Sequence, residues 1–250
     1  MKNKLLGLIG YPLEHSFSRK YFTDKFNKMG LADFEYENFP IDSIDKITDL
    51  IQNHPNLIGL NVTIPYKEKI LPFLDELSED AKAIGAVNTI KITRGPNGIK
   101  LKGFNTDAIG FRKSLKPFLT PQHERALIIG TGGASKAVAY TLENLGIDYL
   151  FVSRSAKSDK MIGYNEINEY VMKFHLLIIN TSPIGTFPNV NDAPQIPYEF
   201  ITEQHFLYDL VYNPEMSLFL QKGKEKDAEI LNGHDMLINQ AEEAWNIWNS

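Results

Sequence analysis

Short apolar runs alternate with amphipathic stretches along the whole of this 250-residue chain. Runs of this length are typical of buried strands, and apolar residues three or four apart are typical of helices that cover a sheet. Strands are predicted at residues 4–10, 34–39, 57–64, 86–92, 99–104, 126–129, 149–152, 176–179 and 206–211. Helices are predicted at residues 17–29 and 41–51, from Pro65 onward, and at 108–115, 134–145 and 236–248. This alternation favours an α/β fold with parallel strands and right-handed crossovers.

A proline-containing segment divides the pattern into two parts. Residues 116–124 include Pro117 and Pro121, and they predict a hinge between two units. Before it, the turn residues 94–98 separate two strand-like runs and predict a β-hairpin.

Composition excludes several classes of function. Hydrophobic residues make up 43% of the chain and charged residues 23%, as in an ordinary globular enzyme, and the net charge of −5 argues against nucleic acid or an anionic membrane surface as a partner. The chain has no cysteine, which excludes disulfides and thiolate chemistry, and its scattered histidines predict no metal site. No apolar run reaches the length of a membrane span, and the strand-like run at residues 5–9 has no cleavage site typical of a signal peptide. A cytoplasmic location fits these features.

The most informative stretch is Asn-Val-Thr-Ile-Pro-Tyr-Lys at residues 61–67. Asn61 and Thr63 alternate with apolar residues and therefore leave the same face of a strand. Pro65 ends the strand and predicts the start of a helix, and Lys67 lies in its first turn. Ligands of open α/β sheets bind at such strand ends. Taken alone, Lys67 is equally well interpreted as a solvated surface lysine.

A glycine-rich turn, Gly130-Thr131-Gly132-Gly133-Ala134-Ser135, lies between a predicted strand and helix. Glycines allow a pyrophosphate to approach the backbone, and the helix N-terminus offers free N–H groups to it. A tight turn without a ligand is the alternative interpretation. The next strand ends at Ser153, Arg154 and Ser155, where an NAD site would carry an acidic residue. Arg154 can pair with a 2′-phosphate, which predicts a preference for NADP.

Other polar residues have plain structural alternatives. Asp107 can be a favourable charge in the first turn of a helix, and Asn88 an ordinary amide at a strand edge. Ser16 and Ser18 can cap the first helix, and His15 is better interpreted as structural than as catalytic.

Together these motifs resemble those of shikimate dehydrogenases, in matching order along essentially the whole chain. They are Gly10 to Ser18, Asn61 to Lys67, Gly85 to Thr89, Gly103 to Asp107, Gly130 to Ala134, Asn180 to Pro183, Tyr208 to Pro214 and Asn232 to Gln240. One departure follows Ser18, where the family has proline and then a His-Asn pair and this chain has Arg19-Lys20-Tyr21-Phe22.

The resemblance implies an N-terminal α/β substrate domain at residues 1–115, a C-terminal Rossmann domain for NADP at 116–233, and a final helix at 234–250 that returns to the first domain. It implies NADPH-dependent, reversible reduction of 3-dehydroshikimate to shikimate, with Lys67 as acid/base or stabilising cation and Asp107 beside it. Substrate ligands by position are Ser16, Ser18, Asn61, Thr63, Asn88, Tyr212 and Gln240. Cofactor ligands by position are Gly130, Thr131, Gly132, Gly133, Ala134, Ser153, Arg154, Ser155, Thr181, Ser182, Leu210 and Gly233.

Two alternatives stay open at this stage. One is a quinate/shikimate dehydrogenase with relaxed cofactor use. The other is a non-catalytic NADP(H)-binding sensor, although the presence of both Lys67 and Asp107 argues against it. The expected partner is a small molecule, and the protein is expected to be a monomer or a homodimer.

Overall fold

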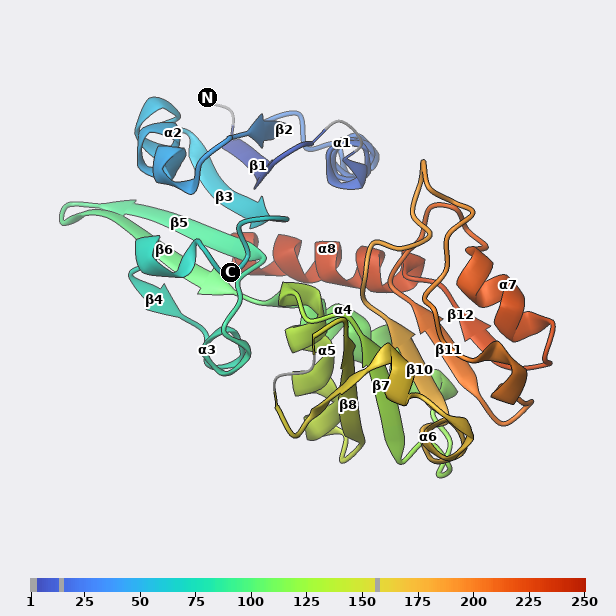
Figure 1. The fold of residues 1–250 in the computed structure, drawn as a ribbon. Helices are drawn as coiled ribbons and strands as arrows, with labels where there is room; N and C mark the ends of the chain where they lie inside the picture. Colours follow the sequence, from blue (N-terminus) through green and yellow to red (C-terminus); the bar gives the residue numbers. More distant parts are fainter. Residues whose placement is uncertain (1–3, 14–15, 156–157) are drawn as a thin grey trace. The chain divides into compact units, whose positions relative to one another are not determined.

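The computed structural model describes residues 4–13, 16–155 and 158–250. The chain divides into two compact units, shown in Figure 1. Unit 1 contains Met1–Thr106 together with Ala241–Ser250, and unit 2 contains Asp107–Gln240. Residues 107–115 and 234–240, which the sequence grouped with the first domain, therefore cluster with unit 2 in their contacts.

Unit 1 is built on a mixed sheet with strand order β2-β1-β3-β5-β6-β4 (Figure 1). β1 pairs in parallel with β2 and β3, whereas β5 runs antiparallel to both β3 and β6. The strands are β1 Lys4–Gly10, β2 Phe34–Pro40, β3 Leu57–Val62, β4 Glu76–Leu77, β5 Thr89–Gly95 and β6 Gly98–Phe104. The sheet thus joins a parallel half to the predicted hairpin.

The helices of unit 1 follow local capping rules. α1, Phe17–Met29, begins at the Ser16 cap and ends at Gly30, whose φ of 66° is the left-handed conformation that glycine adopts readily. Its other helices are α2 Ile47–Asn53 and α3 Glu79–Ile84, with the 3₁₀ segments η1 Ile44–Lys46 and η2 Leu71–Phe73.

The helix predicted from Pro65 is wrong. No helix forms over residues 64–70, and the regular segment that follows them directly is the 3₁₀ turn η2. Pro72 lies inside this segment, and proline cannot donate the backbone N–H that a continuing helix needs. The helix predicted at 41–51 likewise starts late, since η1 precedes α2.

Unit 2 is built on a sheet with strand order β12-β11-β10-β7-β8-β9, in which every described pairing is parallel. The strands are β7 Arg125–Ile129, β8 Asp148–Ser153, β9 Met161–Gly163, β10 Leu177–Asn180, β11 Phe206–Asp209 and β12 Glu229–Leu231. The helices within this unit are α5 Gly133–Asn144, α6 Glu169–Phe174 and α7 Leu218–Lys224. Two more helices are divided between the units: α4 Thr106–Leu115 begins with the last residue of the first segment of unit 1, and α8 His234–Asn249 enters unit 1 at Ala241.

Both faces of the unit 2 sheet are covered. Ile128 packs in one apolar cluster with Val138 of α5, and its neighbour Ile129 packs in another with Phe219 of α7. Central strands buried on both sides explain the continuous apolar runs of the sequence. The parallel α/β architecture predicted for this half is confirmed.

The C-terminal part of α8 belongs to unit 1, as predicted for the returning helix. Trp248 is buried there, and its indole Nε1–H donates to the backbone oxygen of Ile90, 3.0 Å away. A side chain at Gly59 of β3 would overlap this indole, so glycine gives the ring its space on the sheet. Within the described part of the chain, no helix has the length and apolar character needed to cross a membrane.

Candidate functional site

In unit 1, polar side chains meet where β3 and β5 adjoin. The Tyr36 hydroxyl donates to Oδ1 of Asn61 over 2.7 Å. Nδ2 of Asn61 donates to the backbone oxygen of Asn88 at 3.3 Å and to Oγ1 of Thr89 at 3.2 Å. Asn61 is only 5% exposed, so these bonds satisfy an amide that would otherwise be costly to bury.

Asn88 extends this network to the start of α4. Its Oδ1 accepts from the backbone N–H of Thr106 at 2.7 Å, and its Nδ2 donates to the Thr106 hydroxyl at 3.0 Å. Thr106 is the first residue of α4, and Asp107 follows it directly. Asn88 is therefore more than an amide at a strand edge, because it fixes the point where this helix begins.

Lys67 lies in the turn after β3 and is half-buried. Its backbone oxygen accepts from the N–H of Val87 at 2.8 Å, which ties the turn to the residue before Asn88. Half-buried Thr63 is held by a backbone bond to Ile9 at 2.9 Å. The structure thus brings the segments of Asn61, Thr63, Lys67 and Asn88 into one region of unit 1.

The two serines before and within α1 differ in their bonding. Ser16 is the N-cap and accepts from the Arg19 N–H at 3.5 Å, so its predicted capping alternative is confirmed. Ser18 lies inside the helix. Burial raises the pKa of Tyr36 in β2, and the side chain of Ser18 opposes this effect. His15 lies outside the described residues.

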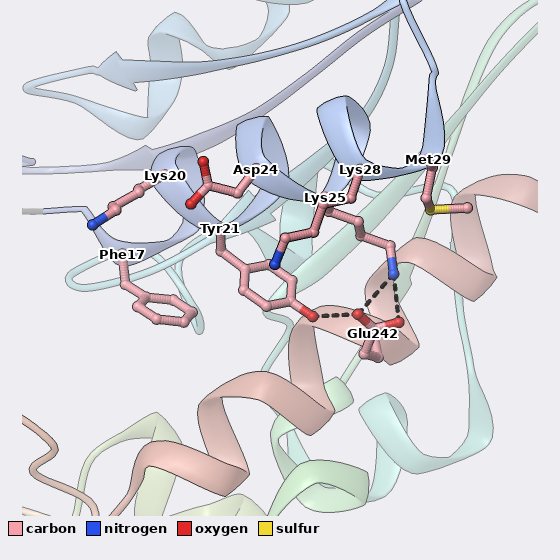
Figure 2. Close-up of a pocket in the computed structure, with 8 residues that line it drawn as sticks. All are labelled: Phe17, Lys20, Tyr21, Asp24, Lys25, Lys28, Met29 and Glu242. Carbon is pink, nitrogen blue, oxygen red and sulfur yellow. Dashed lines mark hydrogen bonds and ion pairs between the residues drawn. The ribbon is translucent and has the colours of Figure 1, made fainter.

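Two of the residues that depart from the family pattern, Lys20 and Tyr21, line a groove of about 510 Å³ on α1. Figure 2 shows Tyr21 and Lys25 reaching from α1 to Glu242 on the C-terminal part of α8. The Tyr21 hydroxyl donates to this carboxylate, and Nζ of Lys25 pairs with it at 2.6 Å. Burial and the neighbouring carboxylate raise the pKa of Tyr21. The changed segment therefore ties α1 to the returning helix.

In unit 2, the glycine turn joins β7 to α5. Gly130 has a φ of 113°, a conformation that favours glycine, and a Cβ there would lie 2.8 Å from Oγ1 of Thr181. Gly132 is the N-cap of α5 and offers no side chain of its own to the free N–H groups of the first turn. Ser135, which stands where the third glycine is usual, closes the turn by donating to the backbone oxygen of Gly132 at 2.5 Å. This narrow cradle fits a pyrophosphate.

The second strand end of unit 2 lies beside the glycine turn. β8 pairs in parallel with β7, so Ser153, which ends β8, and Arg154, which follows it, lie at the same edge of the sheet. The Ser155 N–H donates to the Ser153 side chain at 3.3 Å, and the Arg154 side chain is exposed. Burial raises the pKa of Tyr164, and the charge of Arg154 opposes that effect.

The third strand end carries a buried polar cluster whose centre the sequence reasoning missed. Asp209 ends β11 fully buried, and Oδ1 accepts from Nδ2 of Asn180 at 2.9 Å and from the Val211 N–H at 3.0 Å. Asn180 in turn accepts from the Ser182 hydroxyl at 2.6 Å. Burial raises the pKa of Asp209 to about 6. An acidic residue at the end of an apolar strand was the available signal.

Two close backbone contacts position further predicted residues of unit 2. A Cβ at Gly110 of α4 would lie 2.6 Å from the Met236 backbone oxygen and 3.0 Å from the backbone nitrogen of Gln240. A Cβ at Gly233 would overlap the backbone of Leu210. Oγ1 of Thr141 in α5 also donates to the Ala108 backbone oxygen at 3.2 Å, which links α5 to the residue after Asp107. Gly110 is a supporting residue that the sequence reasoning missed.

Tyr212 is the remaining predicted substrate ligand of unit 2. Tyr212, just after β11, is half-buried, and burial raises its pKa.

Across the described residues, no group of three or more Asp, Glu or His side chains is placed to hold a metal ion.

Comparisons with known proteins agree on one family. Residues 8–90 match the family model described as the shikimate dehydrogenase substrate binding domain. A shikimate dehydrogenase (NADP(+)) from Carboxydothermus hydrogenoformans is 37% identical over 99% of this chain and 92% of the relative. A crystal structure of a shikimate dehydrogenase in complex with NADP+ has a TM-score of 0.85 and 33% identity, covering 99% of this chain and 90% of that one. A quinate dehydrogenase from Corynebacterium glutamicum in complex with NAD has a TM-score of 0.85 and 26% identity, covering 98% and 93%.

Proposed function

This chain belongs to the shikimate dehydrogenase family, and we propose that it catalyses the reversible, NADPH-dependent reduction of 3-dehydroshikimate to shikimate, a step toward aromatic amino acids. The observation that carries this proposal is the 37% identity over 99% of the chain to an NADP-dependent enzyme of that activity. The local geometry of each unit is consistent with it. Unit 1 holds polar side chains suited to a hydroxylated acid, and unit 2 holds a glycine cradle suited to a dinucleotide.

NADPH supplies the hydride when it is bound. The backbone of the turn from Gly130 to Ala134 holds the pyrophosphate, and Arg154 with Ser153 and Ser155 holds the 2′-phosphate. Thr181, Ser182, Leu210 and Gly233 line the nicotinamide end of the site in this proposal. Arg154 sets the preference for NADP, because its planar guanidinium can donate two parallel hydrogen bonds to phosphate oxygens.

Lys67 provides the cation and proton donor for the carbonyl oxygen of the substrate, and Asp107 orients it and accepts from a ring hydroxyl. Ser16 and Ser18 bind the carboxylate. The ring is lined by Asn61, Thr63, Asn88, Tyr212 and Gln240. A positioned acid of this kind contributes about 10²–10⁴-fold to the rate.

The decisive assay follows the loss of NADPH absorbance on addition of 3-dehydroshikimate. We expect rapid oxidation that depends on that substrate, and a decrease in kcat of at least ~100-fold in the Lys67→Ala variant with an unchanged KM for NADPH. Lys69→Ala removes an exposed lysine of the same turn and serves as the matched control, with near-normal turnover expected. Near-normal turnover in Lys67→Ala would return this lysine to the role of a surface charge.

The similarity to a quinate dehydrogenase in complex with NAD supports a second candidate function, which is the oxidation of quinate with NAD. Steady-state rates on shikimate and quinate with each cofactor separate the two functions. A cytoplasmic location and a monomeric or homodimeric state complete the proposal, and equilibrium sedimentation tests the latter.

A further inference from the structure

Asp209 of β11 is a fully buried carboxylate held by hydrogen-bond donors from three segments of unit 2. Its Oδ1 accepts from Nδ2 of Asn180 at 2.9 Å and from the Val211 N–H at 3.0 Å. Its Oδ2 accepts from the hydroxyl of Ser217, the N-cap of α7. A buried carboxylate is costly unless its oxygens are satisfied, so these bonds fix the partners around it. The proposed function gives Asp209 no contact with substrate or cofactor.

Asn180 carries the contact from Asp209 to the loop that follows β10. It is fully buried at the end of that strand, and its Oδ1 accepts from the N–H of Ser182 at 3.1 Å and from the hydroxyl of Ser182 at 2.6 Å. Its Nδ2 donates to the Ile184 backbone oxygen at 3.3 Å as well as to Asp209. A backbone N–H can only donate and a backbone oxygen can only accept, so the orientation of this amide is fixed.

The same two side chains hold the loop that follows β11. The Leu210 N–H donates to the backbone oxygen of Asn180 at 2.9 Å, and the next N–H, that of Val211, donates to the Asp209 carboxylate. Gly233 packs on the Leu210 backbone, and its own N–H donates to the Val211 backbone oxygen at 3.2 Å. Asp209 and Asn180 therefore fix two loops relative to each other.

Both loops carry residues that the proposed function places at the nicotinamide end of the cofactor site, namely Thr181, Ser182, Leu210 and Gly233. Thr181, Ser182 and Leu210 are half-buried and can be reached by a ligand, whereas Asp209 and Asn180 are fully buried. On the basis of the proposed function, we propose that Asp209 and Asn180 form a positioning pair. The pair holds the two loops at the spacing that the nicotinamide half of NADP(H) requires, and it touches no part of the cofactor.

The adenine half of the cofactor depends on other contacts. The proposed function assigns it to Arg154 and the glycine turn, which follow β8 and β7. The first loop stays tied to β7 without Asp209, because the N–H and the hydroxyl of Thr181 both donate to the Ile129 backbone oxygen, at 2.9 Å and 2.7 Å. Loss of the positioning pair should therefore weaken binding of the nicotinamide half and leave binding of the adenine half unchanged.

Calorimetric titration with two ligands separates these halves. One ligand is NADP+, and the other is adenosine 2′,5′-bisphosphate, which has the adenine ribose and its 2′-phosphate but no nicotinamide. Asp209→Ala should raise the Kd for NADP+ about tenfold, the effect of about one hydrogen bond, and leave the Kd for the bisphosphate unchanged. Arg154→Ala should raise both Kd values. Asp209→Asn should keep both within about threefold of the parent, because an amide oxygen still accepts from Asn180 and Val211.

His205→Ala is the matched control, because His205 is also buried and hydrogen-bonded but lies just before β11, at the opposite end of the same strand. It should lower stability and change neither Kd. If Asp209→Ala does not fold, Asn180→Ala removes the other partner of the same bond and should show the same selective loss.

Three results would overturn the positioning role. They are equal weakening of both ligands in Asp209→Ala, a parental Kd for NADP+ in that variant, and the same selective loss in His205→Ala. If the parent protein itself bound neither ligand, the NADP site of the proposed function would be wrong instead.

Discussion

Gly110 of α4 lies directly against the backbone of Gln240 of α8, with no room for a side chain between the two helices. Asp107 lies three residues before Gly110, so it is on the same face of α4. The contact therefore sets the spacing between the helices that carry two of the proposed substrate ligands. Asp107 and Gln240 both belong to unit 2.

We expect Gly110→Ala to raise the KM for shikimate about tenfold and to lower the free energy of unfolding by about 1–3 kcal/mol, the usual cost of overpacking. Helix propensity alone predicts the opposite change in stability, because it favours alanine over glycine by roughly 1 kcal/mol. Initial rates at varied shikimate and urea unfolding measure the two effects.

Gly95→Ala is the control for Gly110→Ala, because a Cβ at Gly95 meets nothing within 4 Å. It should leave both KM and stability nearly unchanged. A Gly110→Ala enzyme with parental KM and higher stability would show that the helices separate without consequence for substrate.

Features set by local pattern were predicted well from the sequence. The buried strands of unit 2 were recognisable because strands covered on both faces are continuous apolar runs. The glycine turn was recognisable because its spacing is local to one βα connection.

The helix expected from Pro65 is a local error, because Pro72 interrupts it and that proline was visible in the sequence.

Features that depend on distant contacts were not predicted. The bond from Tyr36 to Asn61 and the contact of Gly110 with Gln240 join segments far apart in the chain. The hydrophobic periodicity of a single helix or strand contains no information about such contacts. A glycine within an amphipathic helix was the available sign of close approach.

Cofactor choice gives the second prediction. Arg154→Ala should raise the KM for NADP about 10–100-fold and leave the KM for NAD nearly unchanged, since only NADP carries the 2′-phosphate. Arg125→Ala is the matched control, because Arg125 is also exposed but begins β7, at the opposite end of the strand from the glycine turn. Equal effects of Arg154→Ala on both cofactors would remove the phosphate-binding role.

The tie between α1 and α8 gives the third prediction. Glu242 accepts from the hydroxyl of Tyr21 and also pairs with Lys25. The side chain of Glu242 is 41% exposed, so solvent screens these contacts and each contributes little to stability. A double-mutant cycle of Tyr21→Phe and Glu242→Gln should show a coupling of about 0.5–1 kcal/mol in urea unfolding. Additive effects would mean that the changed segment after Ser18 does not anchor the returning helix.

Asp209 gives the fourth prediction, which concerns pH. Burial raises the pKa of this carboxyl from 3.8 to about 6, so the folded state holds its proton more tightly than the unfolded state does. The resulting stability is fully present below pH 3.8 and is lost as the pH rises through about 6. Over that window the loss should be about 2–3 kcal/mol, at 1.36 kcal/mol per pKa unit.

The buried histidines act in the opposite sense and must be separated from Asp209. Burial lowers the pKa of His123, His175 and His205, so they favour the folded state above pH 6.5 and destabilise it as the pH falls. Asp209→Asn retains these histidines and lacks only the carboxyl titration. Subtracting its unfolding free energy from that of the parent at each pH between 4 and 7 cancels the histidine contribution. The difference in unfolding free energy should fall as the pH rises. If the substitution by asparagine also destabilises the protein by an amount that does not depend on pH, the difference changes by the same amount at every pH and its slope is unaffected. A flat difference would mean that Asp209 titrates alike in the folded and unfolded states.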